Sequence, residues 1–269
     1  MFLSNLKYIL FLKRLKISIF VCLFTNVVNA QQELYKEDFF VRNGDTLKYR
    51  ILYPKDFSKD IRYPLVLFLH GAGGRGNENH RQLIHGRKLF ASEEIRENFP
   101  AIIVLPQCPK EDYWSNATVD RSTYPFSLTF PENDPPTKSM SLVMDFMDSM
   151  IAKPYVSKEQ VYVGGLSMGG MGTFEILSRK PDMFAAAFAI CGAGNPILTK
   201  NYAQKVPLWI FHGAKDNVIK PQCSMDMVLA IIENGGTPNF NLYADDNHNS
   251  WDSAFSEPYL IPWLFSKSK

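Results

Sequence analysis

The 269-residue chain has few cysteines and no marked excess of charge of either sign. Apart from Cys22 near the N-terminus, its cysteines are Cys108, Cys191 and Cys223, and none has the CxxC spacing typical of metal sites. Three cysteines permit at most one internal disulfide, so disulfides cannot supply the framework of the fold. We expect a hydrophobic core to stabilise the protein, and we expect no metal site.

The first thirty residues have the pattern of an export signal. They contain four basic residues and no acidic residue, and an apolar run extends from Ile17 to Val28. A basic start, an apolar middle and a small residue at the break predict a secretory signal peptide that is cleaved after Ala30. A membrane anchor is the alternative, but a membrane span requires about 20 apolar residues. We expect a periplasmic or extracellular protein with no stable membrane span after cleavage.

The charge that remains after cleavage excludes one class of partner. The whole chain has a formal charge of +2 and residues 1–30 carry +4, so residues 31–269 carry −2. Nucleic acids and anionic lipids attract strongly basic surfaces. We therefore expect no nucleic-acid partner.

Residues 31–269 alternate between short apolar segments and segments of helical period. A β-hairpin is expected at 39–42 and 46–53, on either side of an Asn-Gly-Asp turn. Further strands are expected at 64–69, 101–105, 161–164, 185–190, 207–211 and 239–243, and helices at 139–151, 168–178, 222–233 and 253–265. This alternation predicts one α/β domain with a mainly parallel sheet flanked by helices. Ligands of such sheets bind beyond the carboxyl ends of the strands.

Residues 106–138 form the exception, because they show no period and are rich in proline and aromatic residues. Structureless segments of this length are uncommon in compact domains and often form binding loops or lids. A packed surface loop is the alternative.

The segment VYVGGLSMGGMG, from Val161 to Gly172, places one serine among several glycines. Gly165 to Gly169 fits G-x-S-x-G, which between a strand and a helix is a nucleophile elbow. The glycines are needed where the neighbouring strand and helix leave no room for a Cβ atom. We predict that Ser167 is a nucleophile and that the Met168 N–H stabilises the oxyanion formed during acyl transfer.

A serine hydroxyl is a weak nucleophile and needs a base. In the elbow fold, the chain order is serine, acid, histidine. Of five histidines, only His212 and His248 follow Ser167, and only His248 leaves room for an acid at a strand end before it. We predict that His248 is the base and that His212, at the end of an apolar strand, is a hydrogen-bonded structural residue.

The acid is expected in a loop directly after a strand. Asp216 follows the strand expected at 207–211 and is the predicted acid. Asp245 and Asp246 lie too near His248 in the sequence to reach its far ring nitrogen easily. They are expected to serve loop structure and solvent contact.

The loop after the strand at 64–69 reads HGAGGRG, from His70 to Gly76. It is the expected source of a second oxyanion donor, with the Ala72 N–H as first choice and the Gly73 N–H as second. The same residues fit G-x-G-x-x-G, so a dinucleotide-binding fold is a rival interpretation. Against it, the motif does not follow the first strand, and no apolar helix start follows Gly76.

Four segments in this order, LHGAGGRG, GLSMGGMGTFEIL, HGAKDNVI and NHNSW, resemble the α/β-hydrolase superfamily. More narrowly, they resemble secreted bacterial esterases of the polyhydroxybutyrate-depolymerase and feruloyl-esterase-like kind, which are grouped with dienelactone-hydrolase-like and prolyl-oligopeptidase-like proteins. The similarity spans about Tyr35 to Lys269. It implies a catalytic α/β-hydrolase domain, residues 31–269, with no large cap domain, and it does not fix the substrate.

The sequence therefore predicts a secreted serine hydrolase that cleaves small or polymer-linked carboxylic esters without a cofactor. A feruloyl or acetyl ester on a carbohydrate is the expected substrate. Gln107, Tyr113 and Trp114 are the predicted substrate contacts, since aromatic faces stack on sugar or feruloyl rings. The alternatives are a serine peptidase and a catalytically silent binding protein, although the latter usually lacks a triad member.

Overall fold

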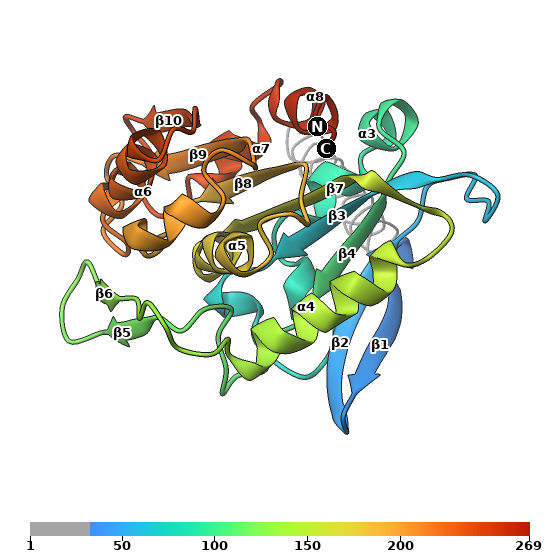
Figure 1. Cartoon of the computed structure of the whole chain (residues 1–269), viewed down its shortest axis with the longest axis horizontal. Coiled ribbons are helices and arrows are strands. Elements are labelled where there is room, and N and C mark those ends of the chain that lie inside the picture. The colour runs from blue at the N-terminus through green and yellow to red at the C-terminus, as the bar shows by residue number, and fades with distance from the viewer. Residues whose placement is uncertain (1–32) are drawn as a thin grey trace, which may run out of the picture.

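The computed structural model describes residues 33–269, so the predicted signal peptide lies outside the described residues. These residues form an eight-stranded mixed sheet in the order β1-β2-β4-β3-β7-β8-β9-β10, with helices on both faces (Figure 1). Six neighbouring strands, from β4 to β10 in this order, run parallel, and β2 is antiparallel to β4. The bounds are β1 Lys36–Arg42, β2 Asp45–Leu52, β3 Tyr63–Leu69, β4 Ile102–Pro106, β7 Val156–Leu166, β8 Ala186–Ile190, β9 Leu208–Gly213 and β10 Asn239–Tyr243.

The predicted hairpin is confirmed as β1 and β2. Arg42 pairs with Asp45, which leaves Asn43 and Gly44 as a two-residue turn. Both turn residues have positive φ, 52° and 86°, as the turn type that matches the twist of a hairpin requires.

Strand β3 shows how the sheet builds a core on each face. Its alternate residues Leu65, Leu67 and Leu69 pack with α4 (Lys138–Ile151), α5 (Met168–Arg179) and α6 (Pro221–Glu233). Val66 and Phe68 point to the opposite face, where they pack with α2 (Arg87–Ala91), α7 (Trp251–Phe255) and α8 (Leu260–Phe265). All five side chains are fully buried. Such burial on both faces explains the continuous apolar run in the sequence.

The helix predicted at 253–265 is wrong as a single element. The structure has two short helices, α7 and α8, with Pro258 between them. Proline has no N–H and its ring clashes with the preceding turn, so it interrupts a helix. The structure also adds α2 and α3 (Glu93–Asn98), which the sequence analysis did not predict.

Residues 106–138 are not structureless throughout. They contain a small antiparallel hairpin of β5 (Thr118–Asp120) and β6 (Ser127–Thr129). Figure 1 shows this hairpin beside the end of the sheet to which the parallel strands point. Within residues 33–269, this segment adds no large cap domain over the sheet, as the sequence resemblance implied.

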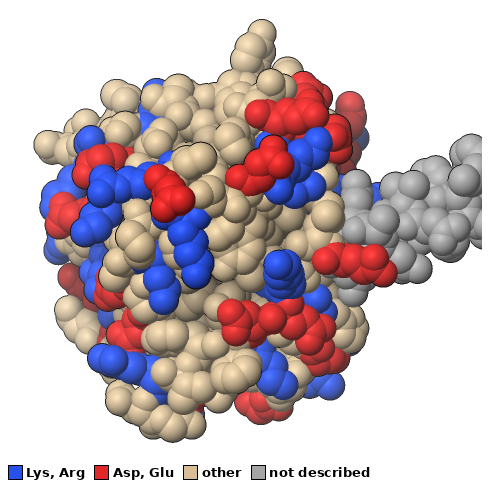
Figure 2. Space-filling view, turned by 90° about the vertical axis from the view of Figure 1, so that its right-hand side faces the viewer, with Lys and Arg blue, Asp and Glu red and all other residues tan. Residues whose placement is uncertain are grey.

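Three further observations concern sulfur, charge and hydropathy. Cys108, Cys191 and Cys223 are unpaired in the described part of the chain. On the face shown in Figure 2, basic and acidic side chains are interspersed. Between residues 33 and 269, no helix has both the length and the apolar character needed to cross a bilayer.

Candidate active site

Ser167 occupies a sharp turn between β7, which ends at Leu166, and α5, which begins at Met168. Its φ of 54° and ψ of −119° lie in a region that L-residues rarely adopt. The neighbouring glycines make this turn possible. A Cβ atom on Gly169 would lie 1.9 Å from the Leu69 carbonyl oxygen, and one on Gly165 would lie 2.3 Å from the Gly169 oxygen. The glycines therefore clear the space around the serine, as the sequence predicted.

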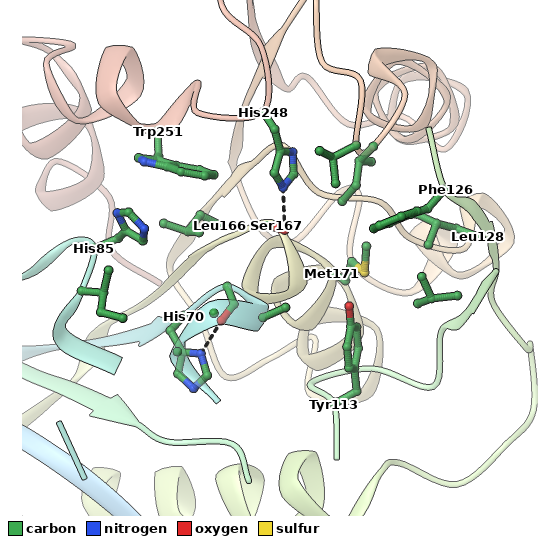
Figure 3. A pocket seen from close by; sticks show the side chains of 18 of the residues that line it. His70, His85, Tyr113, Phe126, Leu128, Leu166, Ser167, Met171, His248 and Trp251 are labelled. Atoms are coloured by element: carbon green, nitrogen blue, oxygen red, sulfur yellow. Dashed lines mark hydrogen bonds between the residues drawn. The ribbon is translucent and has the colours of Figure 1, made fainter. Parts of the chain in front are cut away.

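The structure brings together the three residues of the predicted triad. His248 Nε2 lies 3.0 Å from Ser167 Oγ, and His248 Nδ1 lies 2.7 Å from Asp216 Oδ2 (Figure 3). Asp216 comes from the loop after β9, and His248 from the loop between β10 and α7. The geometry permits a proton to pass from the serine hydroxyl to the imidazole while the carboxylate holds the opposite nitrogen.

Asp216 is buried but well supplied with hydrogen-bond donors. Its Oδ1 atom accepts from the N–H groups of Val218 and Ile219, at 2.8 and 3.0 Å. Burial alone would raise the pKa of Asp216, but hydrogen bonds from His212 and His248 outweigh it and hold this pKa well below its usual value. The carboxyl group is therefore ionised and can stabilise a positive charge on His248.

His212 is the buried, hydrogen-bonded residue that the sequence predicted. Its Nδ1 atom lies 2.7 Å from Ser224 Oγ, and its Nε2 atom lies 3.1 Å from the Ile219 carbonyl oxygen. The same Nε2 atom lies 3.2 Å from Asp216 Oδ2, a contact that the sequence analysis did not foresee. His212 thus touches the acid and not the serine.

The alternative acids do not reach the histidine. Asp245 forms an exposed ion pair with Lys215 at 2.7 Å. Asp246 Oδ2 has no hydrogen-bond partner among residues 33–269. The acid in contact with His248 is Asp216, and neither alternative takes its place.

The predicted oxyanion donors lie at the start of two helical turns. Met168 is the first residue of α5, and Ala72 opens the short 3-10 helix η1 (Ala72–Gly74). The first N–H groups of a helix have no carbonyl partner within it. A Cβ atom on Gly71 would lie 3.6 Å from the Ser167 Cβ, so this loop packs directly against the serine. Ala72 and Gly73 line the same cavity as Ser167, and the role of the Met168, Ala72 and Gly73 N–H groups as oxyanion donors stays a prediction.

Three buried residues support the loop that carries Ala72. His70 Nε2 accepts from the Cys108 N–H at 3.0 Å, and its Nδ1 lies 2.7 Å from the Gly71 carbonyl oxygen. Burial lowers the pKa of His70 to about 4, so the ring is neutral. The Gln107 Nε2 donates to the Gly74 carbonyl oxygen at 3.0 Å.

The predicted substrate contacts of Trp114 and Gln107 are wrong. Trp114 has no exposed surface, and its Nε1–H donates to the His70 carbonyl oxygen at 3.0 Å. It packs on Gly172, where a Cβ atom would lie 2.5 Å from the Trp114 Cβ. Gln107 is only 3% exposed and accepts from the Asn79 N–H. Both side chains donate to carbonyl oxygens of the loop from His70 to Gly76, and neither lines the cavity.

A cavity of about 390 Å³ opens above Ser167. Figure 3 shows apolar side chains to one side of the Ser167–His248 pair and a second group, His85 and Trp251, to the other. The apolar side chains are Tyr113, Phe126, Leu128 and Met171, and all of these except Met171 come from the 106–138 segment. Tyr113 thus lines the cavity, and its contact with substrate stays a prediction.

Cys191 lies behind the triad and is fully buried. Its sulfur and the potential ligand atoms of Asp216 and His248 lie within 4.8 Å of one another. Burial raises the pKa of the Cys191 thiol, so the sulfur is protonated. Since Asp216 and His248 are already bonded to each other, this donor set favours a hydrogen-bonded network over a metal site.

A family model and two curated proteins show similarity to this chain. The model described as Esterase matches residues 42–256, which is well over half of the chain. Among curated proteins, a bifunctional acetylxylan esterase/xylanase from Neocallimastix patriciarum is 33% identical over 86 residues, or 32% of this chain and 13% of its own length. Lysophospholipase-like protein 1 from Mus musculus is 25% identical over 190 residues, covering 68% of this chain and 79% of its own.

Solved structures share the fold. A thermostable esterase has a TM-score of 0.78 at 29% identity, over 89% of this chain and 64% of its own. A ferulic acid esterase from Anaeromyces mucronatus in complex with ferulic acid has a TM-score of 0.59 at 16% identity, over 84% and 89%. Porphyromonas gingivalis dipeptidyl peptidase 4 has a TM-score of 0.62 at 14% identity, over 87% and 35%. These matches confirm the α/β-hydrolase fold. The chain spans less than two thirds of the thermostable esterase and a small part of the bifunctional enzyme.

Proposed function

This chain belongs to the esterase family, and from that membership we propose that it is a serine hydrolase that cleaves carboxylic esters through an acyl-enzyme. The observation that carries the proposal is the hydrogen-bond chain from Ser167 through His248 to the ionised Asp216, at the floor of an open cavity. No cofactor enters this chemistry, because the nucleophile, base and acid are all side chains of the protein.

In the first step, His248 Nε2 accepts the proton of the Ser167 hydroxyl while Oγ attacks the ester carbonyl carbon. The His248 ring becomes positively charged, and Asp216 Oδ2 stabilises it through the Nδ1–H. Because the donors on Asp216 hold its pKa low, the carboxylate keeps its negative charge as the imidazolium forms.

The carbonyl oxygen becomes an oxyanion as the bond to Oγ forms. In the proposed arrangement, the N–H of Met168 and that of Ala72, or of Gly73 beside it, donate to this oxyanion. One such donor is typically worth about 10²–10³ in rate. His248 then donates its proton to the alcohol oxygen, and the alcohol leaves. In the second half of the reaction, His248 accepts a proton from a water molecule, which attacks the acyl-enzyme. The proton then returns to Ser167 Oγ, and the acid is released.

The cavity favours an aromatic acyl group. Tyr113, Phe126, Leu128 and Met171 form an apolar wall next to Ser167, which suits a feruloyl ring better than the small acetyl group. The exposed Arg121 guanidinium lies 4.8 Å from the Phe126 ring centroid, which is a favourable cation–π contact. We take a feruloyl ester on a carbohydrate as the substrate class. The ferulic acid esterase that shares the fold supports the acyl group, and the acetylxylan esterase relative supports the carbohydrate.

A serine peptidase is the second candidate, since Porphyromonas gingivalis dipeptidyl peptidase 4 shares the fold. This chain covers only 35% of that peptidase, which is therefore much longer. The esterase family model and the apolar wall beside Ser167 favour esters over peptides.

We also propose export to the periplasm or the extracellular space, with Gln31 as the new N-terminus. The support is the charge and hydropathy pattern of residues 1–30. N-terminal sequencing of the secreted protein tests this, and recovery of intact Met1 in the membrane fraction would favour an anchor instead.

The function is tested with purified protein on methyl ferulate, p-nitrophenyl acetate and a peptide amide, with Ser167→Ala as the control. The expected order of kcat/KM is ferulate ester, then acetate ester, then amide, with no turnover by the variant. A higher kcat/KM for the amide would identify a peptidase. Absence of turnover on all three substrates would favour the silent binding protein.

A further inference from the structure

A second hollow lies next to the cavity. It is a groove of about 740 Å³ between α2 and α3 on one wall and α7 and α8 on the other. Its partly exposed apolar surface includes Phe99 and Phe255, and its polar surface includes Lys88, Glu94 and Ser256.

The groove and the cavity adjoin each other. Ile84, His85 and Trp251 line both of them. The Trp251 ring lies edge-on to His248, with ring centroids 5.6 Å apart, and its centroid lies 4.8 Å from that of His85. Figure 3 places Trp251 and His85 on the side of His248 that faces away from Phe126 and Leu128. A molecule that extends from the cavity across Trp251 and His85 therefore reaches the groove.

We propose that this groove binds the neutral carbohydrate chain on the alcohol side of the ester. The inference rests on the proposed function, because it assigns the two halves of that substrate to the two sides of Ser167. His248 must give its proton to the leaving alcohol oxygen, so the alcohol half lies beside His248. The acyl half lies against the apolar wall around Phe126. The alcohol half then extends to the opposite side of His248, past Trp251.

The lining of the groove suits a sugar chain. Sugar rings have apolar C–H faces, which pack on aromatic and aliphatic side chains such as Phe99 and Phe255. Their hydroxyl groups donate and accept hydrogen bonds, which Lys88 and Glu94 can complete. Glu93 pairs with Lys55, whereas Lys88 and Glu94 form no ion pair within residues 33–269. The lining thus has one lysine, Lys88, against three carboxylates, those of Glu94, Asp252 and Glu257, which disfavours an anionic polymer and offers acceptors to the hydroxyl groups of a neutral sugar chain.

The test compares a feruloylated oligosaccharide of several sugars with methyl ferulate, whose alcohol half ends before the groove. Two changes alter the groove: the double variant Lys88→Ala/Glu94→Ala removes its free polar groups, and Ser256→Trp fills it. The Ser256 hydroxyl bonds only to the Asp252 carbonyl oxygen, so this change leaves the triad intact. Lys59→Ala serves as the matched control, since this exposed lysine lines neither hollow.

The double variant loses one or two hydrogen bonds to the sugar chain, and Ser256→Trp blocks the groove sterically. Each change is expected to raise KM for the oligosaccharide ester about tenfold. The kcat/KM for methyl ferulate is expected to stay within about twofold of wild type, and Lys59→Ala to match wild type on both substrates. Equal effects on both esters, or no effect on either, would overturn the groove assignment while leaving the esterase function in place. Failure of the wild type to hydrolyse methyl ferulate would instead overturn the function itself.

Discussion

The Nε2 atom of His212 lies 3.2 Å from Asp216 Oδ2, the same oxygen that His248 Nδ1 contacts at 2.7 Å. Asp216 therefore has an imidazole on each side: His248, which faces Ser167, and His212, which lies inside the core. The inner ring is anchored by Ser224 and by the Ile219 carbonyl oxygen. This arrangement fixes the carboxylate in position and predicts unequal roles for the two histidines.

Substitution of the two histidines is expected to separate the base from the positioning residue. His248→Ala should lower kcat by about four decades or more, because triad members act as a unit. His212→Ala should cost about 10- to 100-fold, since it removes one buried hydrogen bond to Asp216. Steady-state kinetics on methyl ferulate measures both. An inactive His212 variant beside an active His248 variant would reverse the assignment of the base.

The acid is tested by two conservative changes in neighbouring loops. Asp216→Asn should lower kcat by about 10⁴, since the amide favours the wrong tautomer of His248 and cannot stabilise its charge. Asp246→Asn serves as the matched control and should change kcat by less than about threefold, because Asp246 does not contact His248. The opposite order of effects would move the acid to the loop before His248.

From the packing at the turn around Ser167, we predict that Gly169→Ala and Gly73→Ala differ sharply in their effect on the free energy of unfolding. In Gly169→Ala, the new methyl group would meet the Leu69 carbonyl oxygen at 1.9 Å, and neither backbone can move without disturbing the sheet. We expect loss of several kcal/mol of unfolding free energy, or no folded protein. Gly73→Ala is the control, because nothing lies within 4 Å of a Cβ atom there. Urea unfolding should show the Gly73 variant close to wild type. Equal stability of the Gly169 variant would contradict the packing described at the elbow.

The neutral state of His70 predicts a dependence of stability on pH. Its pKa is about 4 in the folded protein and close to 6.5 in an unfolded chain. Between these values the unfolded chain binds the proton and the folded protein does not, so stability falls as the pH drops from 6.5 to 4. The full contribution is about 3 kcal/mol.

The control for this prediction is His70→Gln, whose amide can donate and accept as the neutral ring does. The fall in unfolding free energy between neutral pH and about pH 4.5 should be about 2 kcal/mol smaller in the variant. Urea unfolding of both proteins at the two pH values measures the difference. Identical pH dependence in wild type and variant would show that His70 is not a buried neutral ring.

Much of the fold follows from local patterns in the sequence. Strands such as β3 and β4 are short apolar runs, and the turn of Asn43 and Gly44 has the residues that its backbone angles require. Helices α2 and α3 have five and six residues, too few to establish a helical period, and they were missed for that reason. The break between α7 and α8 depends on Pro258. The apolar spacing on either side of Pro258 resembles that of one continuous helix, so the sequence predicted a single helix there.

The site was predicted where the chemistry constrains residue type and order, as for Ser167, Asp216 and His248. It was not predicted where it depends on packing between distant segments. Trp114 follows β4 closely in the sequence, but it is buried because Gly172 on α5 leaves room for its ring. The position of Trp251 beside His248 likewise depends on how α7 packs against the loop before it. Trp251 is part of the NHNSW segment, but the sequence alone assigned it no role.

The central claim is that Ser167 is the nucleophile, and covalent labelling tests it most directly. The purified protein is treated with a fluorophosphonate, and its intact mass, its peptide map and its remaining activity on methyl ferulate are measured together. We predict one phosphonyl group per chain, located on Ser167, with activity lost in proportion to labelling and no label on Ser167→Ala. Loss of activity with the label on another residue, or full activity in a protein labelled at Ser167, would contradict the claim.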